Sequence, residues 1–307
     1  MANEVLHSSL ESDLRMADLI AGEVQILLHD QFSLRDVPGA LLNLGSINGR
    51  GSDTIRVSQM QVDALSATAS EVTATANTAL TDSSFVVAVT RKSLVYEISD
   101  LANMTARLPG DADIVGLARM MVNGTNQAFM DALAASFASL STTSGSTTVN
   151  LSVDTFYDAI ANLELASNTG PGFYCVLHPR QWADLQASIR AESGVVEMRA
   201  DHGDAVGIKP QGYAGSFLGV DIFTSSRCDL INSSADRLGA MFSGGCFAYA
   251  TGTPVAVPGA VMSQPTDMLT VEIQRPDRSA SSLIVGHSYF GVALAEDARG
   301  VGIVSDA

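Results

Sequence analysis

The sequence has few lysines, few cysteines and no long hydrophobic run. Lys92 and Lys209 are the only lysines in 307 residues, and 33 acidic residues against 17 basic ones give a formal net charge of −16. A protein that binds nucleic acid neutralises phosphates with clustered Lys and Arg, so this balance excludes a general nucleic-acid binder. No window approaches the roughly 20 apolar residues that a membrane-spanning helix needs.

The three cysteines, Cys175, Cys228 and Cys246, are far apart and odd in number. They do not form a disulfide framework, and they indicate ordinary buried thiols in a reducing compartment. The N-terminal residues MANEVLHSSLESDLR are polar and acidic, unlike a secretory signal. We therefore expect a soluble protein of a cytoplasm, or one assembled there. With 46% hydrophobic residues, the chain can bury a substantial core.

Two helical patterns are prominent. Residues 11–29 place apolar side chains at the 3.6-residue period, and so does the longer run 113–140, which would span about 40 Å. The first helix needs a partner for its apolar face. The second is long enough to be a spine across a flat molecule, and Asn123–Gly124 near its middle is a point at which it could bend.

Two strand patterns, Asp53–Gln59 and Ser83–Leu101, lie between these helices and are rich in β-branched and aromatic residues. The segment that joins them is rich in Ala, Thr and Ser and has almost no large apolar residue. Its burial therefore cannot offset the entropy of ordering it. Two interpretations stay open: a protruding hairpin that a neighbouring molecule orders, or a flexible surface loop.

The segment FYCVLHPRQWADLQAS (173–188) contains the side chains that look most reactive. Its first five residues form a predicted strand, which His178–Pro179 ends before a helix begins. Cys175 and His178 are three residues apart on a strand and so point to opposite faces, whereas a nucleophilic pair needs hydrogen-bond contact. We interpret the segment as structural, with Trp182 in the core and His178 at the start of the helix.

The weak metal-ligand candidates are Asp201, His202 and Asp204, in the loop ADHGDAVG. No second cluster with ligand spacing completes such a site, so a solvated loop is the favoured interpretation. The sequence also has no Walker loop, GxSxG or HExxH motif, and no GxGxxG between a strand and a helix. It therefore predicts no catalytic residues, no cofactor and no enzyme activity.

In their order along the chain, several segments resemble the major capsid proteins of tailed bacteriophages with the Hong Kong 97-like fold. The extended loop (E-loop) of that fold is resembled by GSDTIRV, the hairpin and SLVYEISDLA. Its spine helix is resembled by residues 113–140, and its axial domain by VLHPRQWADLQ together with GSFLGVDIFTSS. The resemblance implies an α+β fold of these parts: an N-terminal arm with an amphipathic helix (1–48), the E-loop hairpin (49–95), a peripheral domain (96–150) closed by strands of 266–307, and a mainly axial domain (151–265).

The same resemblance implies a coat protein that assembles through hexamers and pentamers into an icosahedral shell around phage double-stranded DNA. The arm and the E-loop would lie over adjacent subunits. The implied partners are further copies of the chain, a scaffolding protein, a portal protein and a possible decoration protein, without a membrane and without sequence-specific DNA binding. The implied location is the virion, after assembly in the host cytoplasm. The acidic charge would keep packaged DNA from adhering to the inner face.

Two features depart from some members of that family. The chain has no long N-terminal scaffolding segment, so we expect a separate scaffolding protein. No lysine lies between Asp53 and Arg91, and Lys92 is at the base of the hairpin. An isopeptide crosslink from the E-loop is therefore not expected, and the shell would be non-covalent. The alternatives are an encapsulin-type compartment, or another phage structural protein such as a tail protein, against which the long helix argues.

Overall fold

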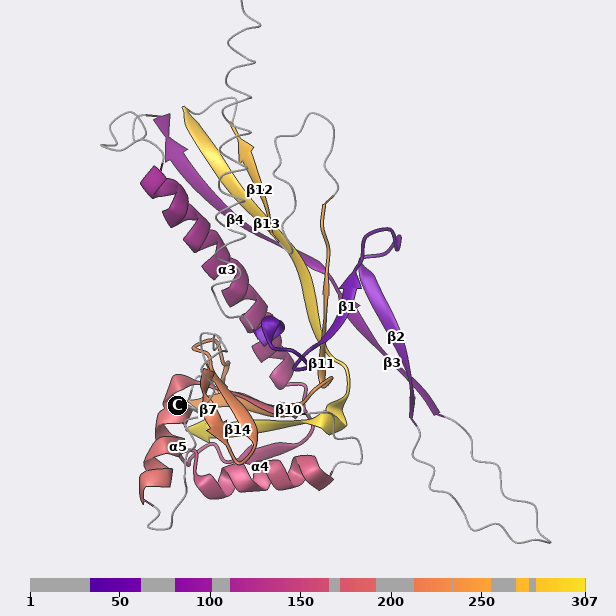
Figure 1. Cartoon of the computed structure of the whole chain (residues 1–307), viewed down its shortest axis with the longest axis vertical. Coiled ribbons are helices and arrows are strands. Elements are labelled where there is room, and N and C mark those ends of the chain that lie inside the picture. The colour runs from indigo at the N-terminus through magenta and orange to yellow at the C-terminus, as the bar shows by residue number, and fades with distance from the viewer. Residues whose placement is uncertain are drawn as a thin grey trace, which may run out of the picture.

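The structure, a computed structural model, describes residues 34–61, 81–100, 111–165, 172–191, 213–233, 235–254, 269–275 and 280–306. Within these ranges the chain has the mixed α+β fold that the sequence predicts (Figure 1). The predicted helix at 11–29 and the middle of the predicted hairpin lie outside the described residues.

Helix α3 (Asp111–Phe137) agrees with the predicted run 113–140 to within a few residues, and α5 (Pro179–Ala191) begins at the proline that the sequence indicated. The other described helical elements are α4 (Val153–Leu165) and the 3-10 turns η1 (Leu34–Asp36) and η2 (Asp297–Arg299). Helix α3 continues through Asn123–Gly124, where the sequence allowed a bend (Figure 1). A Cβ atom at Gly124 would lie 2.4 Å from Leu94 Cδ1, so glycine here permits a close approach between helix and strand.

One sheet is built on the long strand β13 and lies beside α3 (Figure 1). Strand β4 pairs antiparallel with one edge of β13, and β12 and β11 pair antiparallel with successive parts of the other edge. Strand β1 is parallel to β11. The five strands are β13 (Ser281–Leu294), β4 (Thr90–Ser99), β12 (Leu269–Gln274), β11 (Phe247–Thr251) and β1 (Leu42–Ser46).

A second sheet of seven strands forms the lower body in Figure 1. Its order is β5, β14, β10, β6, β8, β7, and β9 pairs with the end of β10. The strands are β5 (Thr143–Gly145), β14 (Gly300–Asp306), β10 (Asp236–Ser243), β6 (Phe173–Leu177), β8 (Val220–Thr224), β7 (Tyr213–Phe217) and β9 (Leu230–Ile231). Strands from the middle and the C-terminal end of the sequence thus complete one sheet.

The two faces of the seven-stranded sheet carry separate cores. Along β6, Tyr174 and Val176 belong to the core that α3 covers, whereas Cys175 and Leu177 belong to the core under α4 and α5. This alternation follows from the two-residue period of a strand. The C-terminal half of α3 also reaches the first sheet, because Phe129 packs edge-on against Tyr249 and tilted against Phe290, at ring distances of 5.8 and 5.6 Å.

A third, two-stranded sheet consists of β2 (Thr54–Gln61) and β3 (Thr81–Ala88). The prediction of one strand from Ser83 to Leu101 is wrong. The strand is interrupted at Val89, and the two strands on either side of it, β3 and β4, pair in different sheets. The Val89 N–H donates to the Asp53 carbonyl at 2.9 Å. At this junction the backbone crosses β13, and a Cβ atom on Gly291 would lie 2.0 Å from the Ala88 oxygen.

The first described residues are fixed to the core. Leu34 and Ala40 are fully buried, in the same cluster as the C-terminal half of α3. The Tyr174 hydroxyl donates to the carbonyl of Pro38, 136 residues earlier in the chain, at 3.0 Å. Packing therefore defines where the described part of the chain begins.

Candidate assembly interface

The β2–β3 hairpin has one apolar and one polar face. In its antiparallel register Ile55 lies opposite Val87, and Val57 lies opposite Phe85. On the other face, the Arg56 guanidinium donates from Nε and Nη2 to Ser84 Oγ, at 3.0 and 2.8 Å. Because successive side chains of a strand point to opposite faces, these residues divide between the two faces of the hairpin.

Only the base of the apolar face is covered. Ile55 and Val87 are 3% and 0% exposed and pack with Ala248 and Ala250 of β11. The next pair outward, Val57 and Phe85, is only partly buried. A two-stranded hairpin alone is marginally stable in water, so this base is what anchors the projecting strands.

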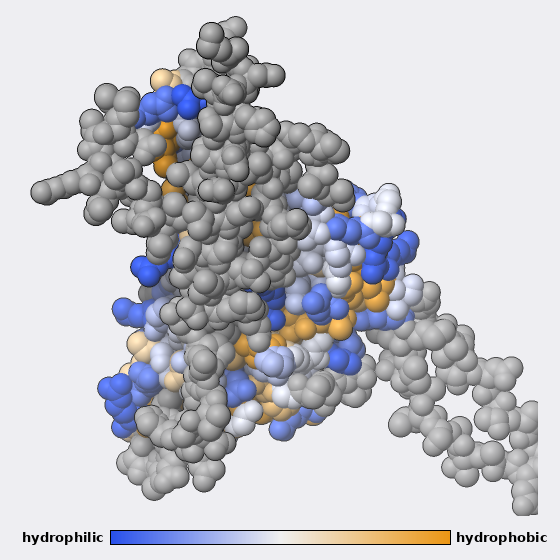
Figure 2. Space-filling view, turned by 45° about the horizontal axis from the view of Figure 1, so that its top comes forward, coloured by the Kyte–Doolittle hydropathy of each residue, from blue (hydrophilic) through white to orange (hydrophobic). Residues whose placement is uncertain are grey.

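Hydrophobic surface gathers beside the hairpin. Val86, on the polar face, is 48% exposed, and Leu42 of β1 is 40% exposed. Figure 2 shows orange, hydrophobic surface at the right of the body, where Figure 1 places β1 and the start of the hairpin. Apolar surface that gathers on one region is typical of an interaction site, whereas singly scattered apolar residues are not.

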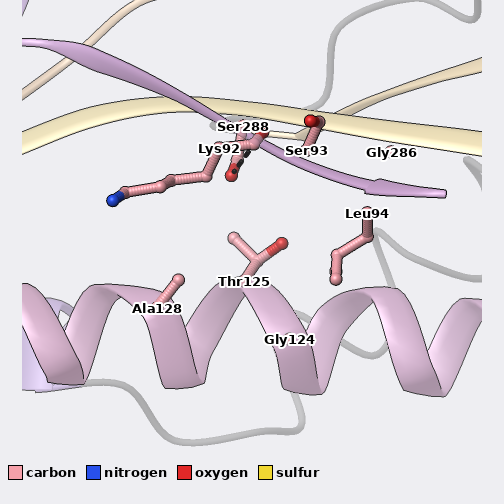
Figure 3. A pocket seen from close by; sticks show the side chains of 8 residues that line it. All are labelled: Lys92, Ser93, Leu94, Gly124, Thr125, Ala128, Gly286 and Ser288. Carbon is pink, nitrogen blue, oxygen red and sulfur yellow. Dashed lines mark hydrogen bonds between the residues drawn. The ribbon is translucent and has the colours of Figure 1, made fainter.

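A cavity of about 160 Å³ lies between α3 and the strands β4 and β13. Figure 3 shows Leu94 pointing toward α3 near Gly124, and the Lys92 side chain extending above Ala128. Small residues on both sides leave this gap. The lining residues are Lys92, Ser93, Leu94, Gly124, Thr125, Ala128, Gly286 and Ser288. The Thr125 hydroxyl donates a hydrogen bond to the Met121 carbonyl at 2.9 Å. Lys92 is the one charged lining residue and it is exposed, so no buried charged group among the lining residues points into the cavity.

Cys175 and His178 lie in successive elements: Cys175 is in strand β6, and His178 precedes helix α5. Cys175 is fully buried, and burial raises the pKa of its thiol well above the usual value. A protonated thiol in the core is not a nucleophile. Burial, with a smaller effect of Arg237, lowers the pKa of His178, and its neutral Nδ1 accepts from the Arg180 N–H at 3.2 Å. His178 therefore caps helix α5, and Trp182 is partly buried against the core.

Gln181 is the structurally important residue that the sequence analysis missed. Its side chain is fully buried and accepts from the His178 N–H at 3.0 Å, while Nε2 lies 3.3 Å from the Arg237 and Ile303 carbonyls and 3.0 Å from Ser305 Oγ. His178 and Gln181 thus form a reciprocal capping box. The spacing of a cap residue and a glutamine three positions later was the available signal.

The metal-ligand candidates Asp201, His202 and Asp204 lie outside the described residues. In the part that is described, no group of three His, Cys, Asp or Glu side chains is arranged to hold a metal ion. No described helix is both long and apolar enough to cross a membrane.

Solved shell proteins share this fold. The capsid of Ralstonia phage GP4 matches with a TM-score of 0.61 at 10% identity, over 87% of each chain. A chain of Mycobacterium phage Che8 matches with a TM-score of 0.54 at 18% identity, over 82% of this chain and 84% of that one. The SrpI encapsulin of Synechococcus elongatus PCC 7942 matches with a TM-score of 0.58 at 14% identity, over 86% and 84%. The chain therefore has the fold that these solved structures share.

The family follows from the sequence itself. The family model described as phage capsid protein matches residues 84–304, so the chain belongs to the phage capsid protein family. Its function is that of a major capsid protein, a structural component of the virion, and the resemblance noted from the sequence is confirmed at this level. No curated protein matches the chain.

Proposed function

We propose that this chain assembles through hexamers and pentamers into an icosahedral shell that encloses phage double-stranded DNA. The observation that carries the proposal is the β2–β3 hairpin, whose apolar face continues past its buried base to the partly buried pair Val57 and Phe85. A strand pair whose apolar face is only partly covered gains stability when a second molecule covers the rest. Contact with a neighbouring subunit supplies that cover.

In this proposal each part of the chain has the role that the Hong Kong 97-like fold gives it. Residues 1–48 form the arm and 49–95 the E-loop. Helix α3 is the spine of a peripheral domain made of 96–150 and 266–307, and 151–265 form most of the axial domain. The two sheets follow this division only in part. Strands β4, β12 and β13 belong to one sheet and β6, β7 and β8 to the other, but β5 and β14 of the proposed peripheral part pair in the second sheet, and β11 of the proposed axial part pairs in the first.

The proposed partners are copies of the chain, a scaffolding protein, a portal protein and a possible decoration protein, with assembly in the host cytoplasm. DNA is enclosed without sequence-specific contacts, which agrees with a net charge of −16. The shell is held by non-covalent contacts, since Lys92 lies in β4, beyond the hairpin strands.

The alternative is an encapsulin-type compartment, which the structural match to the Synechococcus encapsulin supports. The test is to express the chain alone and together with its neighbouring genes, and to image the products by negative-stain electron microscopy. Hexamer rings or closed shells are expected. Nucleic acid inside the shells supports the capsid, and protein cargo without nucleic acid supports the encapsulin. A small uniform oligomer under both conditions would refute both.

A further inference from the structure

Helix α4 presents an unusual outer face. Tyr157, Ala161 and Leu165 are spaced four residues apart and are all exposed, Tyr157 by 47% and Leu165 by 81%. Residues at this spacing lie in one row along a helix. The same outer face carries three exposed acidic residues, Asp154, Asp158 and Glu164, and α4 contains no basic residue. An apolar ridge with acidic flanks is therefore open to solvent.

Helix α5 presents the complementary outer face. Ala183, Ala187 and Ala191 are also spaced four residues apart and exposed, and they form a shallow row without large side chains. Arg180 and Arg190 are exposed near the two ends of this row. Arg180 lies 3.8 Å from Asp184 in its own helix, whereas Arg190 has no ion pair among the described residues.

The two faces fit each other in shape and in charge. Both helices have 13 residues, and each row spans nine of them, about 12 Å. The large side chains at the two ends of the α4 row, Tyr157 and Leu165, can pack over a row of small side chains when helices meet. Acidic flanks on one face and arginines on the other favour the pairing and its register.

The two faces are also placed for contact between copies. Figure 1 shows α4 along the lower flank and α5 along the left flank of the same body. Two different surfaces on different flanks make a head-to-tail contact, and such contacts close into rings when the rotation between subunits permits. Within one subunit, Asp158 and Arg190 do not form an ion pair in the described part of the chain.

We propose that the α4 ridge of one subunit packs on the α5 alanine row of the next subunit in each ring, with Asp158 facing Arg190. This inference rests on the proposed function, since it assigns a contact within the hexamers and pentamers. The occupant of the exposed ridge is thus a second copy of this chain.

The test uses charge reversal in the full-length chain. Asp158→Arg and Arg190→Asp each place like charges at every contact, and we expect each single variant to lower the yield of rings and shells about tenfold or more. The double variant Asp158→Arg/Arg190→Asp restores opposite charges at every contact, so we expect it to assemble like the wild type. Thermal melts of the unassembled subunits check that each variant is folded.

Mixing the two single variants gives the sharpest result. In a ring where they alternate, every α4–α5 contact joins opposite charges, so hexamers should form. A ring of five cannot alternate and keeps at least one like-charged contact. We therefore expect hexamer rings from the mixture, with few pentamers and few closed shells, by native mass spectrometry and electron microscopy.

Several outcomes would overturn the inference. If both single variants build normal shells, the contact is wrong while the capsid function stands; if the wild type builds none, the proposed function fails instead. If the double variant assembles but the mixture does not, the two side chains interact within one subunit. If only Asp158→Arg fails, the ridge faces a different partner. If a reversal prevents folding, Asp158→Asn and Arg190→Gln take its place, and normal assembly by both would also contradict the contact.

Discussion

Replacing Gln181 with leucine should destabilise the subunit strongly, although neither side chain is charged and the two are similar in size. The Nε2 group has two hydrogens for three acceptors, the Arg237 and Ile303 carbonyls and Ser305 Oγ, and Oε1 accepts from the His178 N–H. Leucine removes about three hydrogen bonds and leaves their partners in the core.

The expected size of the effect follows from these contacts. A hydrogen bond within the protein makes a net contribution of about 1 kcal/mol to stability. A buried donor or acceptor left without a partner costs about 1–3 kcal/mol. Gln181→Leu should therefore lower the free energy of unfolding by about 3 kcal/mol or more, and the midpoint of thermal unfolding by about 5 °C or more. Differential scanning calorimetry of the unassembled subunit measures both.

Gln186→Leu is the matched control. Gln186 is in the same helix, is only partly buried, and has no hydrogen bond from its side chain in the described part of the chain. Its replacement should change the free energy of unfolding by no more than about 0.5 kcal/mol. If the two variants melt within about 2 °C of each other, the capping box and its contacts to β10 and β14 do not stabilise the subunit as argued.

Three further predictions concern the chain terminus, the thiols and pH. Deleting residues 1–30 should leave a folded subunit that builds no closed shells, whereas deleting 1–41 removes buried Leu34 and should cost about 3 kcal/mol, measured by urea unfolding. Burial raises the pKa of Cys228 to about 12, so a thiol reagent at neutral pH should label none of the three cysteines until the protein unfolds. The pKa of His178 is lowered in the folded state, so below about pH 6.5 the unfolded chain binds a proton at His178 more readily than the folded chain does. As the pH decreases below this value, the thermal stability of the wild type should therefore decrease more steeply than that of His178→Asn.

The sequence was sufficient to predict features that depend on local periodicity. The apolar spacing between 113 and 140 predicted α3 within three residues at each end, and Met121, Phe129 and Leu133 on that stripe are fully buried. The strand predicted at 173–177, which His178–Pro179 ends, is likewise present as β6 (Phe173–Leu177). Both conclusions needed only the geometry of one element.

Features that depend on contacts between distant segments could not be predicted in this way. The division of 83–101 at Val89 occurs because β4 pairs with β13, almost 200 residues later in the chain, while β3 pairs with β2. The requirement for glycine at position 291 arises at the same crossing. Gln181 reads as an ordinary polar residue of an exposed helix, and only the positions of β10 and β14 make it a core residue.

Several apolar residues of the subunit are exposed or only partly buried, which favours an assembled protein over a monomer. Ile55 and Val87 complete the base of the hairpin, yet the same apolar face continues to Val57 and Phe85 where the subunit covers it less. Tyr157 and Leu165 are likewise exposed on a helix whose inner face is fully buried. Exposed apolar surface costs free energy until something covers it. In the proposed head-to-tail ring, copies of the same chain would cover these surfaces, and the stability of the subunit would then depend on assembly of the shell.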